Sequence, residues 1–440
     1  MEIVIGDDVR KGLLAGLTGE ENERGAALLL THDPASGRFL VRQLLLPADE
    51  EILNATPVEI TFGPQFLVRV TRLAREQKCS IALLHTHPRG FPGFSVRDDE
   101  TEGILRTFMQ QRLPEAHAFS LVLCDGRFIA RELGSSEQLP VRVVGAKMTL
   151  QPDGGGVAFL AQYDRQVRAF GKSGQAMLRC LKVGIVGLGG TGSVVAQQLA
   201  HLGVLTFVLV DPDVVEETNL NRVVGADRES LHRNKVDVAG EMINRIQASA
   251  SVEKLPLNVR SVAAIHALRT VDCVFICTDS HVSRSLLSEL SYQYLVPAID
   301  IGVSINARDG EVLAVTGRTQ MLAPGLPCLW CSRSISAERV REELMTEEQR
   351  AADPYFNEGG ESQPAVISIN STVVSLAVTM FLGAFTALPI EARFQTYDAL
   401  TGKTRPLSCT ADPECWICGS EGVQGAGPSM PLHLAEMEPE

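Results

Sequence analysis

The 440-residue sequence lacks an excess of basic residues, because 40 Lys and Arg oppose 53 Asp and Glu and the formal net charge is −13. Nucleic-acid binding depends on clustered Lys and Arg, so this composition argues against a general polyanion binder. The N-terminus, Met1 to Asp8, also lacks the basic start and apolar core of a signal peptide. We therefore expect a cytoplasmic protein, and among its ten cysteines we expect Cys pairs to be metal ligands before disulfides.

One stretch lacks charge altogether, since no Asp, Glu, Lys or Arg occurs between Glu361 and Glu391. Such a stretch is long enough to cross a bilayer. However, it lacks flanking Lys or Arg and an aromatic belt, and polar residues interrupt it. These are Ser368, Asn370, Ser371, Thr372, Ser375 and Thr379. We expect a helix buried at the centre of a domain or dimer, and no membrane association.

The first 145 residues predict a domain of strands and helices. Apolar patterns indicate strands at 26–30, 39–46, 80–85 and 119–124, and a helix at 65–77. Further on, three consecutive glycines follow Pro152-Asp153 and cannot hold a regular element. We therefore expect residues 146–157 to form a linker after a first domain at 1–145.

Beyond this linker, short apolar strands alternate with helices, which predicts a parallel, doubly wound α/β sheet of Rossmann type. Strands are expected at 182–187, 205–211, 252–257, 273–278 and 297–301, and helices at 192–202, 234–248 and 283–294. The second domain would cover residues 158–420. The tail 421–440, rich in Gly, Pro and Glu, is expected to be mobile.

The first candidate site is a metal site at the end of the predicted strand 80–85. His85 and His87 are two positions apart, so on a strand they point the same way and can hold one cation. Asp98 would supply a third ligand and leave a fourth position for water, as in hydrolytic zinc sites. Two histidines alone can also end a strand by chance, so the longer pattern around them matters.

That longer pattern is His85-x-His87, then seven residues, then Ser95-x2-Asp98. It resembles the JAMM motif of JAB1/MPN-type metalloproteases, and the resemblance covers residues 1–140. It implies an α+β domain in which His85, His87 and Asp98 bind a catalytic zinc ion. Ser95 would support the tetrahedral intermediate.

A general base must also take the proton from the zinc-bound water. In the JAMM family this base is a Glu from an earlier strand–helix region, and Glu23, before a run of small and apolar residues, matches it best. Glu20 and Glu21 remain alternatives. The implied activity is that of a deubiquitinase-like isopeptidase or peptidase that removes or trims a ubiquitin-like protein.

The second candidate site begins with Gly187-Leu188-Gly189-Gly190-Thr191-Gly192, directly after a predicted strand. Its glycines, Gly187, Gly189, Gly190 and Gly192, would let backbone N–H groups approach phosphates at a helix N-terminus. Asp211 ends the next strand, 19 residues after Gly192, where it could bond a ribose hydroxyl. These features alone would predict an NAD-dependent dehydrogenase.

The residues after Asp211 change this interpretation. A triphosphate with Mg²⁺ needs cations that neutralise charge and an Asp that holds the metal, and a dehydrogenase does not. The chain supplies this set in order: Asp213, Asn219, Arg222, Lys235 and Asp279. The set resembles the ThiF/MoeB superfamily of ubiquitin-activating-type adenylyltransferases over residues 158–420.

The ThiF/MoeB resemblance implies a role for each of these residues. Asp211 would hold the ribose of ATP, with Asp213 beside it. Asn219, Arg222 and Lys235 would hold the phosphates, and Asp279 would hold Mg²⁺. Members of this superfamily adenylate the C-terminal glycine of a β-grasp protein, either a ubiquitin-like protein or a sulfur carrier.

A segment upstream, Tyr163-Asp164-Arg165-Gln166-Val167, resembles the N-terminal segment of the same superfamily. In that family an Arg of this segment reaches into the site of the partner subunit. The resemblance therefore implies that Arg165 acts on ATP across a homodimer.

Four cysteines form two C-x2-C pairs, Cys328 with Cys331 and Cys415 with Cys418. Paired knuckles of this kind give four thiolates in tetrahedral geometry, which predicts a closed structural zinc site. Cys409 lies close by and has no assigned role.

The crossover segment from Ser332 to Pro364 contains no cysteine. Ubiquitin activation proper continues to a thioester on a Cys in this segment, so we expect the reaction to stop at the acyl-adenylate or to pass to a separate acceptor, such as a conjugating enzyme.

The two resemblances together imply a bifunctional enzyme of a bacterial ubiquitin-like system, which uses ATP, Mg²⁺ and two zinc ions. One alternative is activation of a sulfur carrier for cofactor or metabolite biosynthesis. A second alternative is a scaffold in which one half is inactive.

Overall fold

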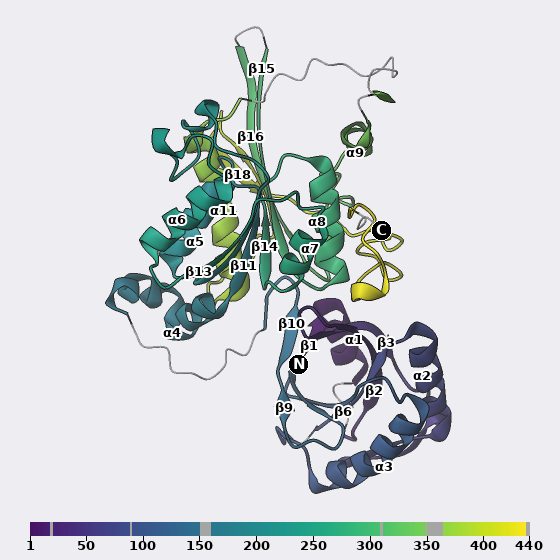
Figure 1. The fold of residues 1–440 in the computed structure, drawn as a ribbon. Coiled ribbons are helices and arrows are strands. Elements are labelled where there is room, and N and C mark those ends of the chain that lie inside the picture. The colour runs from purple at the N-terminus through teal and green to yellow at the C-terminus, as the bar shows by residue number, and fades with distance from the viewer. Residues whose placement is uncertain are drawn as a thin grey trace. The chain divides into compact units, whose positions relative to one another are not determined.

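The computed structural model describes residues 1–17, 21–88, 90–149, 160–308, 311–346, 348–349 and 364–436. The chain divides into two compact units (Figure 1). Unit 1 comprises Met1–Gln151, Gln293–Leu295 and Val423–Met430, and unit 2 comprises Pro152–Tyr292, Val296–Gly422 and Pro431–Glu440. The predicted linker 146–157 lies outside the described residues from position 150 onward.

Unit 1 contains an eight-stranded mixed sheet in the order β10-β1-β3-β2-β6-β7-β8-β9. Its strands are β1 (Glu2–Gly6), β2 (Gly25–Asp33), β3 (Arg38–Leu45), β6 (Ser80–Thr86), β7 (Ala118–Cys124), β8 (Arg127–Glu132), β9 (Gln138–Leu139) and β10 (Val141–Val144). A separate hairpin joins β4 (Ile52–Thr56) and β5 (Glu59–Phe62). The helices are α1 (Asp7–Leu17), α2 (Pro64–Gln77) and α3 (Val96–Arg112).

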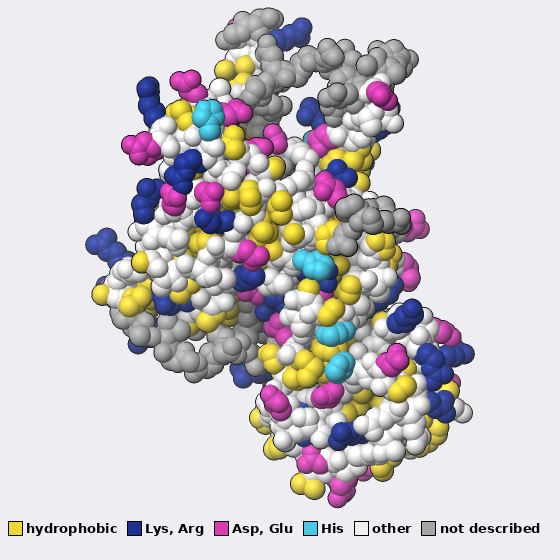
Figure 2. Space-filling view, viewed as in Figure 1, with side chains coloured by type: hydrophobic (Ala, Val, Ile, Leu, Met, Phe, Trp, Pro, Cys, Tyr) yellow, Lys and Arg dark blue, Asp and Glu magenta, His cyan; other side chains and the backbone are white. Residues whose placement is uncertain are grey.

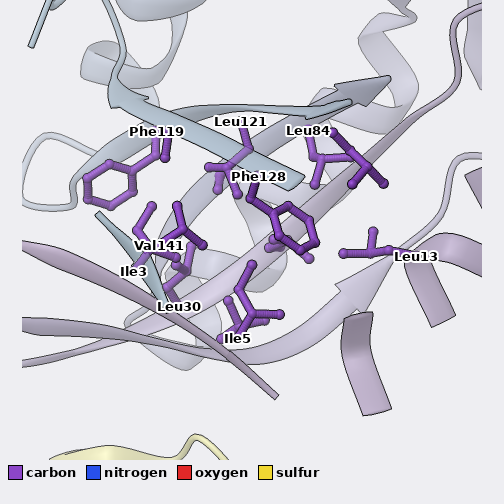
Figure 3. Close-up of a cluster of buried hydrophobic side chains, with 14 of the residues drawn as sticks. Ile3, Ile5, Leu13, Leu30, Leu84, Phe119, Leu121, Phe128 and Val141 are labelled. Atoms are coloured by element: carbon purple, nitrogen blue, oxygen red, sulfur yellow. The ribbon is translucent and has the colours of Figure 1, made fainter. Parts of the chain in front are cut away.

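Both faces of this sheet are apolar, and each belongs to a different buried cluster. In β6, Ala82 and Leu84 join the cluster that includes Leu13 of α1 (Figure 3). Ile81 and Leu83 join the cluster that contains residues of α2 and α3. Alternate residues of a strand point to opposite faces, so a continuous apolar run such as that of β6 is buried on both sides. The strand therefore delivers His85 at its end in a fixed direction.

Unit 2 contains a second eight-stranded sheet, in the order β13-β12-β11-β14-β15-β16-β17-β18. Its strands are β11 (Lys182–Val186), β12 (Thr206–Val210), β13 (Ser251–Leu255), β14 (Cys273–Ile276), β15 (Ala298–Arg308), β16 (Glu311–Leu322), β17 (Phe394–Asp398) and β18 (Lys403–Pro406). The pairs from β13 to β15 are parallel, as predicted. From β15 to β18 the pairing is antiparallel, which the sequence analysis did not predict.

Helices cover both faces of the second sheet. They are α4 (Asp164–Cys180), α5 (Gly192–Leu202), α6 (Lys235–Ile246), α7 (Val262–Arg269), α8 (His281–Gln293) and α11 (Ile367–Phe385). A further helix, α9 (Ala337–Leu344), buries none of its residues and does not cover the sheet. Figure 1 shows α5, α6 and α11 on one face and α7 and α8 on the other. This arrangement is the doubly wound α/β fold expected of a Rossmann-like domain.

Helix α11 is the uncharged stretch of the sequence. By length and composition it could cross a membrane, but half of its most apolar window is buried inside the protein. It contacts β15, β16 and α5, and Gln198 of α5 donates a hydrogen bond to Ser375 at 2.9 Å. The packing is close enough that a Cβ on Gly317 of β16 would collide with Val373. These contacts are those of a core helix.

The tail was predicted to be mobile, and the structure differs over its described part, residues 421–436. Val423 and Ala426 are buried, and the backbone carbonyls of Gly427 and Met430 accept hydrogen bonds from Gln293 at 2.8 and 2.7 Å. Apolar residues spaced among the glycines and prolines provide this anchoring, which composition alone does not reveal.

Acidic and basic side chains are intermixed on the face shown in Figure 2. Among the described residues on that face, no large continuous basic area is visible. This distribution gives no support to a nucleic-acid surface there.

Candidate functional sites

The turn after β11 has a conformation that requires glycine. Gly187 has a φ of +86°, and a Cβ there would lie 2.8 Å from the carbonyl oxygen of Cys277. A Cβ on Gly192 would overlap the carbonyl oxygen of Gly187. Around Gly189, by contrast, a Cβ would meet nothing within 4 Å. The turn is thus closely packed at Gly187 and Gly192 and open at Gly189, where a phosphate could approach the N-terminus of α5.

Asp211 braces this turn. It is buried, and its carboxylate accepts hydrogen bonds from the N–H groups of Leu188 at 2.5 Å and Asp213 at 2.8 Å. Burial raises the pKa of Asp211, while these N–H groups and Lys235 act in the opposite direction. The structure therefore shows a structural role for Asp211, and its contact with a ribose stays a prediction.

The predicted phosphate ligands lie around the same strand ends. Lys235, the first residue of α6, donates to Asp213 Oδ2 at 2.7 Å. Asn219 is buried and accepts the N–H of Glu216 at 3.2 Å. The Cδ atom of Arg222 would lie 3.3 Å from a Cβ on Gly190, so this side chain flanks the glycine turn.

Asp279 and Arg165 are less constrained. Asp279 follows β14 and its side chain is exposed, so its carboxylate is accessible to a cation. Arg165 is exposed near the start of α4. Its proposed action in a partner subunit stays a prediction.

Asn370, which no sequence motif predicted as a site residue, also reaches this turn. It is buried on α11, and its Nδ2 occupies the space that a Cβ on Gly190 would take. The only signal in the sequence was a polar residue within an uncharged apolar stretch. An open backbone turn, two adjacent cations and a free carboxylate together fit the binding of ATP with Mg²⁺.

The family model for ThiF matches residues 163–417, which include every residue of this site. The chain belongs to the ThiF family. Residues 163–417 form a ThiF/MoeB-type adenylyltransferase domain.

Three curated relatives match more than half of this chain along most of their own length. The molybdopterin-synthase adenylyltransferase of Escherichia coli is 26% identical over 262 residues, which is 59% of this chain and 96% of that protein. The sulfur carrier protein adenylyltransferase of Thermus thermophilus is 28% identical over 267 residues, 60% of this chain and 93% of that protein. The SAMP-activating enzyme E1 of Haloferax volcanii is 25% identical over 268 residues, 60% and 90% respectively.

Among solved structures, E. coli MccB with ATP aligns with a TM-score of 0.46 and 19% identity, over 60% of this chain and 76% of that chain.

The four cysteines predicted to bind zinc converge within the ThiF domain. Their sulfur atoms all lie within 4.8 Å of one another, with 3.6 Å between Cys328 and Cys415 and 3.5 Å between Cys331 and Cys418. Zn–S bonds of about 2.3 Å in a tetrahedron place two sulfurs about 3.8 Å apart. The cluster therefore fits structural zinc. Cys409 is adjacent but points elsewhere, with its sulfur 3.5 Å from the carbonyl oxygen of Cys331.

The candidate metal site formed by His85, His87 and Asp98 lies in unit 1, outside the ThiF domain. His85 Nε2 is 3.1 Å from His87 Nε2 and 3.1 Å from Asp98 Oδ1. His87 Nε2 is 3.7 Å from Asp98 Oδ2 and 3.8 Å from Glu23 Oε1. Two nitrogen ligands of a tetrahedral zinc ion, with bonds of roughly 2.0–2.1 Å, lie about 3.3 Å apart. The donor set therefore fits zinc.

Local contacts aim these side chains. His87 Nδ1 lies 2.9 Å from the carbonyl oxygen of Phe91, which leaves Nε2 facing the other ligands. Ser95 caps α3: its hydroxyl accepts the N–H of Asp98 at 3.2 Å, and Asp98 Oδ2 accepts the N–H of Ser95 at 2.5 Å. This capping box holds Asp98 in place.

The structure also separates the candidate bases. Glu23 is buried beside His87, whereas Glu21 is exposed, and Glu20 lies outside the described residues. Burial raises the pKa of Glu23 to about 7, opposed by the charge of His85. Burial also acts to raise the pKa of Asp98, but its hydrogen bond and ion pair with His85 outweigh this and lower it. The two carboxyl groups thus differ in proton affinity.

Proposed function

We propose that this protein uses ATP to adenylate the C-terminal glycine of a small β-grasp carrier protein. The observation that carries this proposal is the convergence of the glycine turn, the Lys235–Asp213 pair and Arg222 within a domain of the ThiF family. The activities named for its relatives, on molybdopterin synthase and a sulfur carrier protein, support the same substrate class.

In this reaction a carboxylate oxygen of the carrier attacks the α-phosphorus of ATP. The bond between the α-phosphorus and the bridging oxygen breaks, which yields an acyl-adenylate and pyrophosphate. The N–H groups of the open turn and the cations Arg222 and Lys235 would stabilise charge on the phosphates. Asp279 would hold Mg²⁺, which neutralises the leaving pyrophosphate. Arg165 would contribute from a second subunit of a homodimer.

We propose a sulfur carrier as the substrate in preference to a protein modifier that is conjugated. The crossover segment has no cysteine for a thioester, so the adenylate itself would meet the acceptor. A sulfur donor fits this role, because its sulfur atom can accept the acyl group and displace AMP. A ubiquitin-like modification system with a separate conjugating enzyme is the alternative, and a conjugate formed after adenylation would distinguish it.

The test is exchange of pyrophosphate into ATP. Exchange should depend on a carrier protein ending in Gly-Gly and should vanish in Asp279→Ala, because the metal loses its carboxylate. Asp237→Ala, which alters an exposed Asp of α6 paired with Lys254, should leave exchange unchanged. Undiminished exchange in Asp279→Ala would disprove the site assignment.

We also propose that unit 1 is a zinc peptidase that cleaves after the terminal glycine of the same carrier. The convergence of His85, His87, Asp98 and Glu23 supports it. Zinc bound there would supply a water molecule of lowered pKa. Glu23 would accept the proton of that water, and Ser95 would donate a hydrogen bond to the developing oxyanion. Cleavage would expose the carboxylate that the ThiF domain activates.

The test uses a carrier extended by a few residues beyond Gly-Gly. His87→Ala should abolish trimming while pyrophosphate exchange with a mature carrier persists. His232→Ala, which alters a histidine of unit 2 remote in sequence from this motif, serves as the control. Trimming that survives both a chelator and His87→Ala would refute the peptidase.

A further inference from the structure

A buried cluster in the ThiF domain contains two guanidinium groups for one carboxylate. Asp300 of β15 is completely buried. Arg318 of β16 donates from Nη2 to Asp300 Oδ2 at 2.6 Å. Arg284 of α8 places Nε 3.2 Å from Asp300 Oδ1 and donates from Nη2 to the carbonyl oxygen of Ile301 at 3.1 Å. Within the described part of the chain, Asp300 is the only carboxylate that pairs with either arginine.

This cluster has unused hydrogen-bonding capacity. The Nε atoms of Arg284 and Arg318 are buried, as is Asp300 Oδ1, and none of the three has a partner in hydrogen-bonding geometry among the described residues. Arg284 Nε and Asp300 Oδ1 face each other at 3.2 Å, so Arg318 Nε is the donor without a nearby carboxylate oxygen. Gly302 lies between the two arginines, because a Cβ on it would be 3.5 Å from Arg284 Nη2 and 3.6 Å from Arg318 Nη2. One excess positive charge in a largely buried place is unfavourable unless a second anion joins it. A carboxylate matches the forked geometry of guanidinium groups.

The position of the cluster indicates which anion it would take. The glycine turn and Lys235 follow β11 and β12, on one side of β14 in the sheet order. Asp300 and Arg318 of the arginine cluster lie on β15 and β16, on the other side. Asp300 pairs in register with Ile276, three residues before Asp279, and Arg284 is in the first turn of α8 that follows. In the sheet order the cluster therefore lies beside the strand that leads to the proposed magnesium ligand, on the side away from the nucleotide elements.

From this arrangement we propose that Arg284 and Arg318 bind the terminal carboxylate of the carrier and position it for attack on ATP. The inference rests on the proposed adenylation. The carboxylate and the α-phosphate repel each other, and two guanidinium groups at the carboxylate would reduce this repulsion. Asp300 orients both arginines and offsets part of their charge, so that the carboxylate stays free enough to react.

The first experiment compares full-length wild type with Arg318→Gln, which leaves Asp300 paired with Arg284. In pyrophosphate exchange, the KM for a Gly-Gly-terminated carrier protein should rise about tenfold or more, because a charge-assisted hydrogen bond is lost. The KM for ATP should stay within about twofold. Arg405→Gln, the same change at an exposed arginine of β18, is the matched control and should alter neither value.

The second experiment measures binding without catalysis. A fluorescent hexapeptide ending in Gly-Gly is prepared as the free acid and as the C-terminal amide, and its affinity is measured by anisotropy without ATP. Wild type should prefer the acid about fivefold or more, and Arg318→Gln should lose this preference. Arg318→Lys, which keeps the charge but not the fork, should be intermediate and replaces the Gln variant if that fails to fold.

The inference is overturned if wild type binds neither peptide or does not distinguish them. It is also overturned if Arg318→Gln raises the KM for ATP instead of that for the carrier. Failure of wild type to catalyse exchange at all would instead count against the proposed function. Exchange that is normal in both wild type and Arg318→Gln would count against this inference alone.

Discussion

The two candidate catalytic sites hold their charged groups in different ways. In unit 1, Glu23 and His87 are buried, and neighbouring side chains and backbone groups fix the ligands within about 4 Å of one another. In the ThiF domain, the backbone of the glycine turn is rigid, but Asp279 and Arg165 are exposed. The proposed metal ligands therefore lie close enough together to hold one cation, whereas the proposed ATP ligands Asp279 and Arg165 project into solvent.

This difference determines what a substitution should change. Buried charges must be compensated inside the protein, so loss of a compensating partner should unfold the surroundings of the metal site. Exposed charges at a nucleotide site have little influence on folding, so their loss should slow the reaction and leave the fold intact.

The largest expected effect is a loss of stability around the candidate metal site when Arg131 is replaced. This residue of β8 donates to Glu102 at 3.0 Å and to Asp99 at 2.6 Å, both on α3, and it stacks on Phe94. Arg131→Met leaves the buried carboxylate of Glu102 without its cation, which should cost about 3–5 kcal/mol. Amide hydrogen exchange in β7 and β8 should accelerate, and trimming should be lost, while pyrophosphate exchange continues.

The double variant Arg131→Met with Glu102→Met is the matched control. It removes both charges together, so no unpaired carboxylate stays buried, and most of the amide protection should return. If the double variant is as unprotected as the single one, the stacking on Phe94 matters more than the ion pair.

The next effect is on catalysis in the ThiF domain. Lys235→Ala should lower the rate of pyrophosphate exchange by about 10²–10³, the range typical for removal of one stabilising group at a reacting centre. Lys254→Ala removes an exposed lysine of β13. This lysine pairs with Asp237 of α6, the helix that begins at Lys235, and its loss should change the rate less than about twofold. Equal losses in both variants would mean that α6 needs its ion pairs for folding and that Lys235 has no special role.

Much of the fold could be predicted because its apolar periodicity is strong. The strands that precede His85, Gly187 and Asp211 lie within a few residues of their expected positions. The antiparallel extension of the second sheet was missed because its reasons are tertiary. Gly317 reads as a strand breaker, yet it is where Val373 of α11 packs against β16.

The site residues also divide into those that a local pattern predicts and those that depend on tertiary contacts. Residues in dense motifs, such as His85, His87 and the glycine turn, could be identified from spacing. Asn370 could not, because it reaches the glycine turn from α11, an element far away in sequence. Arg284 and Arg318 could not either, because their pairing with Asp300 depends on how α8 packs against the β15–β16 hairpin. No local pattern marks a buried arginine as incompletely neutralised.

The smallest expected effect separates the two metal sites from each other. Wild type should contain about two zinc ions per chain by mass spectrometry of the native protein. Cys415→Ser should remove the one in the ThiF domain, since four thiolates form that closed site, and His85→Ala should remove the other. Cys409→Ser should leave both, because the sulfur of Cys409 lies against backbone carbonyls of Cys331 and Thr410 and not within the four-sulfur cluster. Loss of zinc from Cys409→Ser would show that this cysteine exchanges into the cluster, and the site would then be less closed than its geometry indicates. Retention of zinc would show that four thiolates are enough to close the ThiF-domain site, and an open metal position would then belong to unit 1, where the proposed hydrolysis would require it.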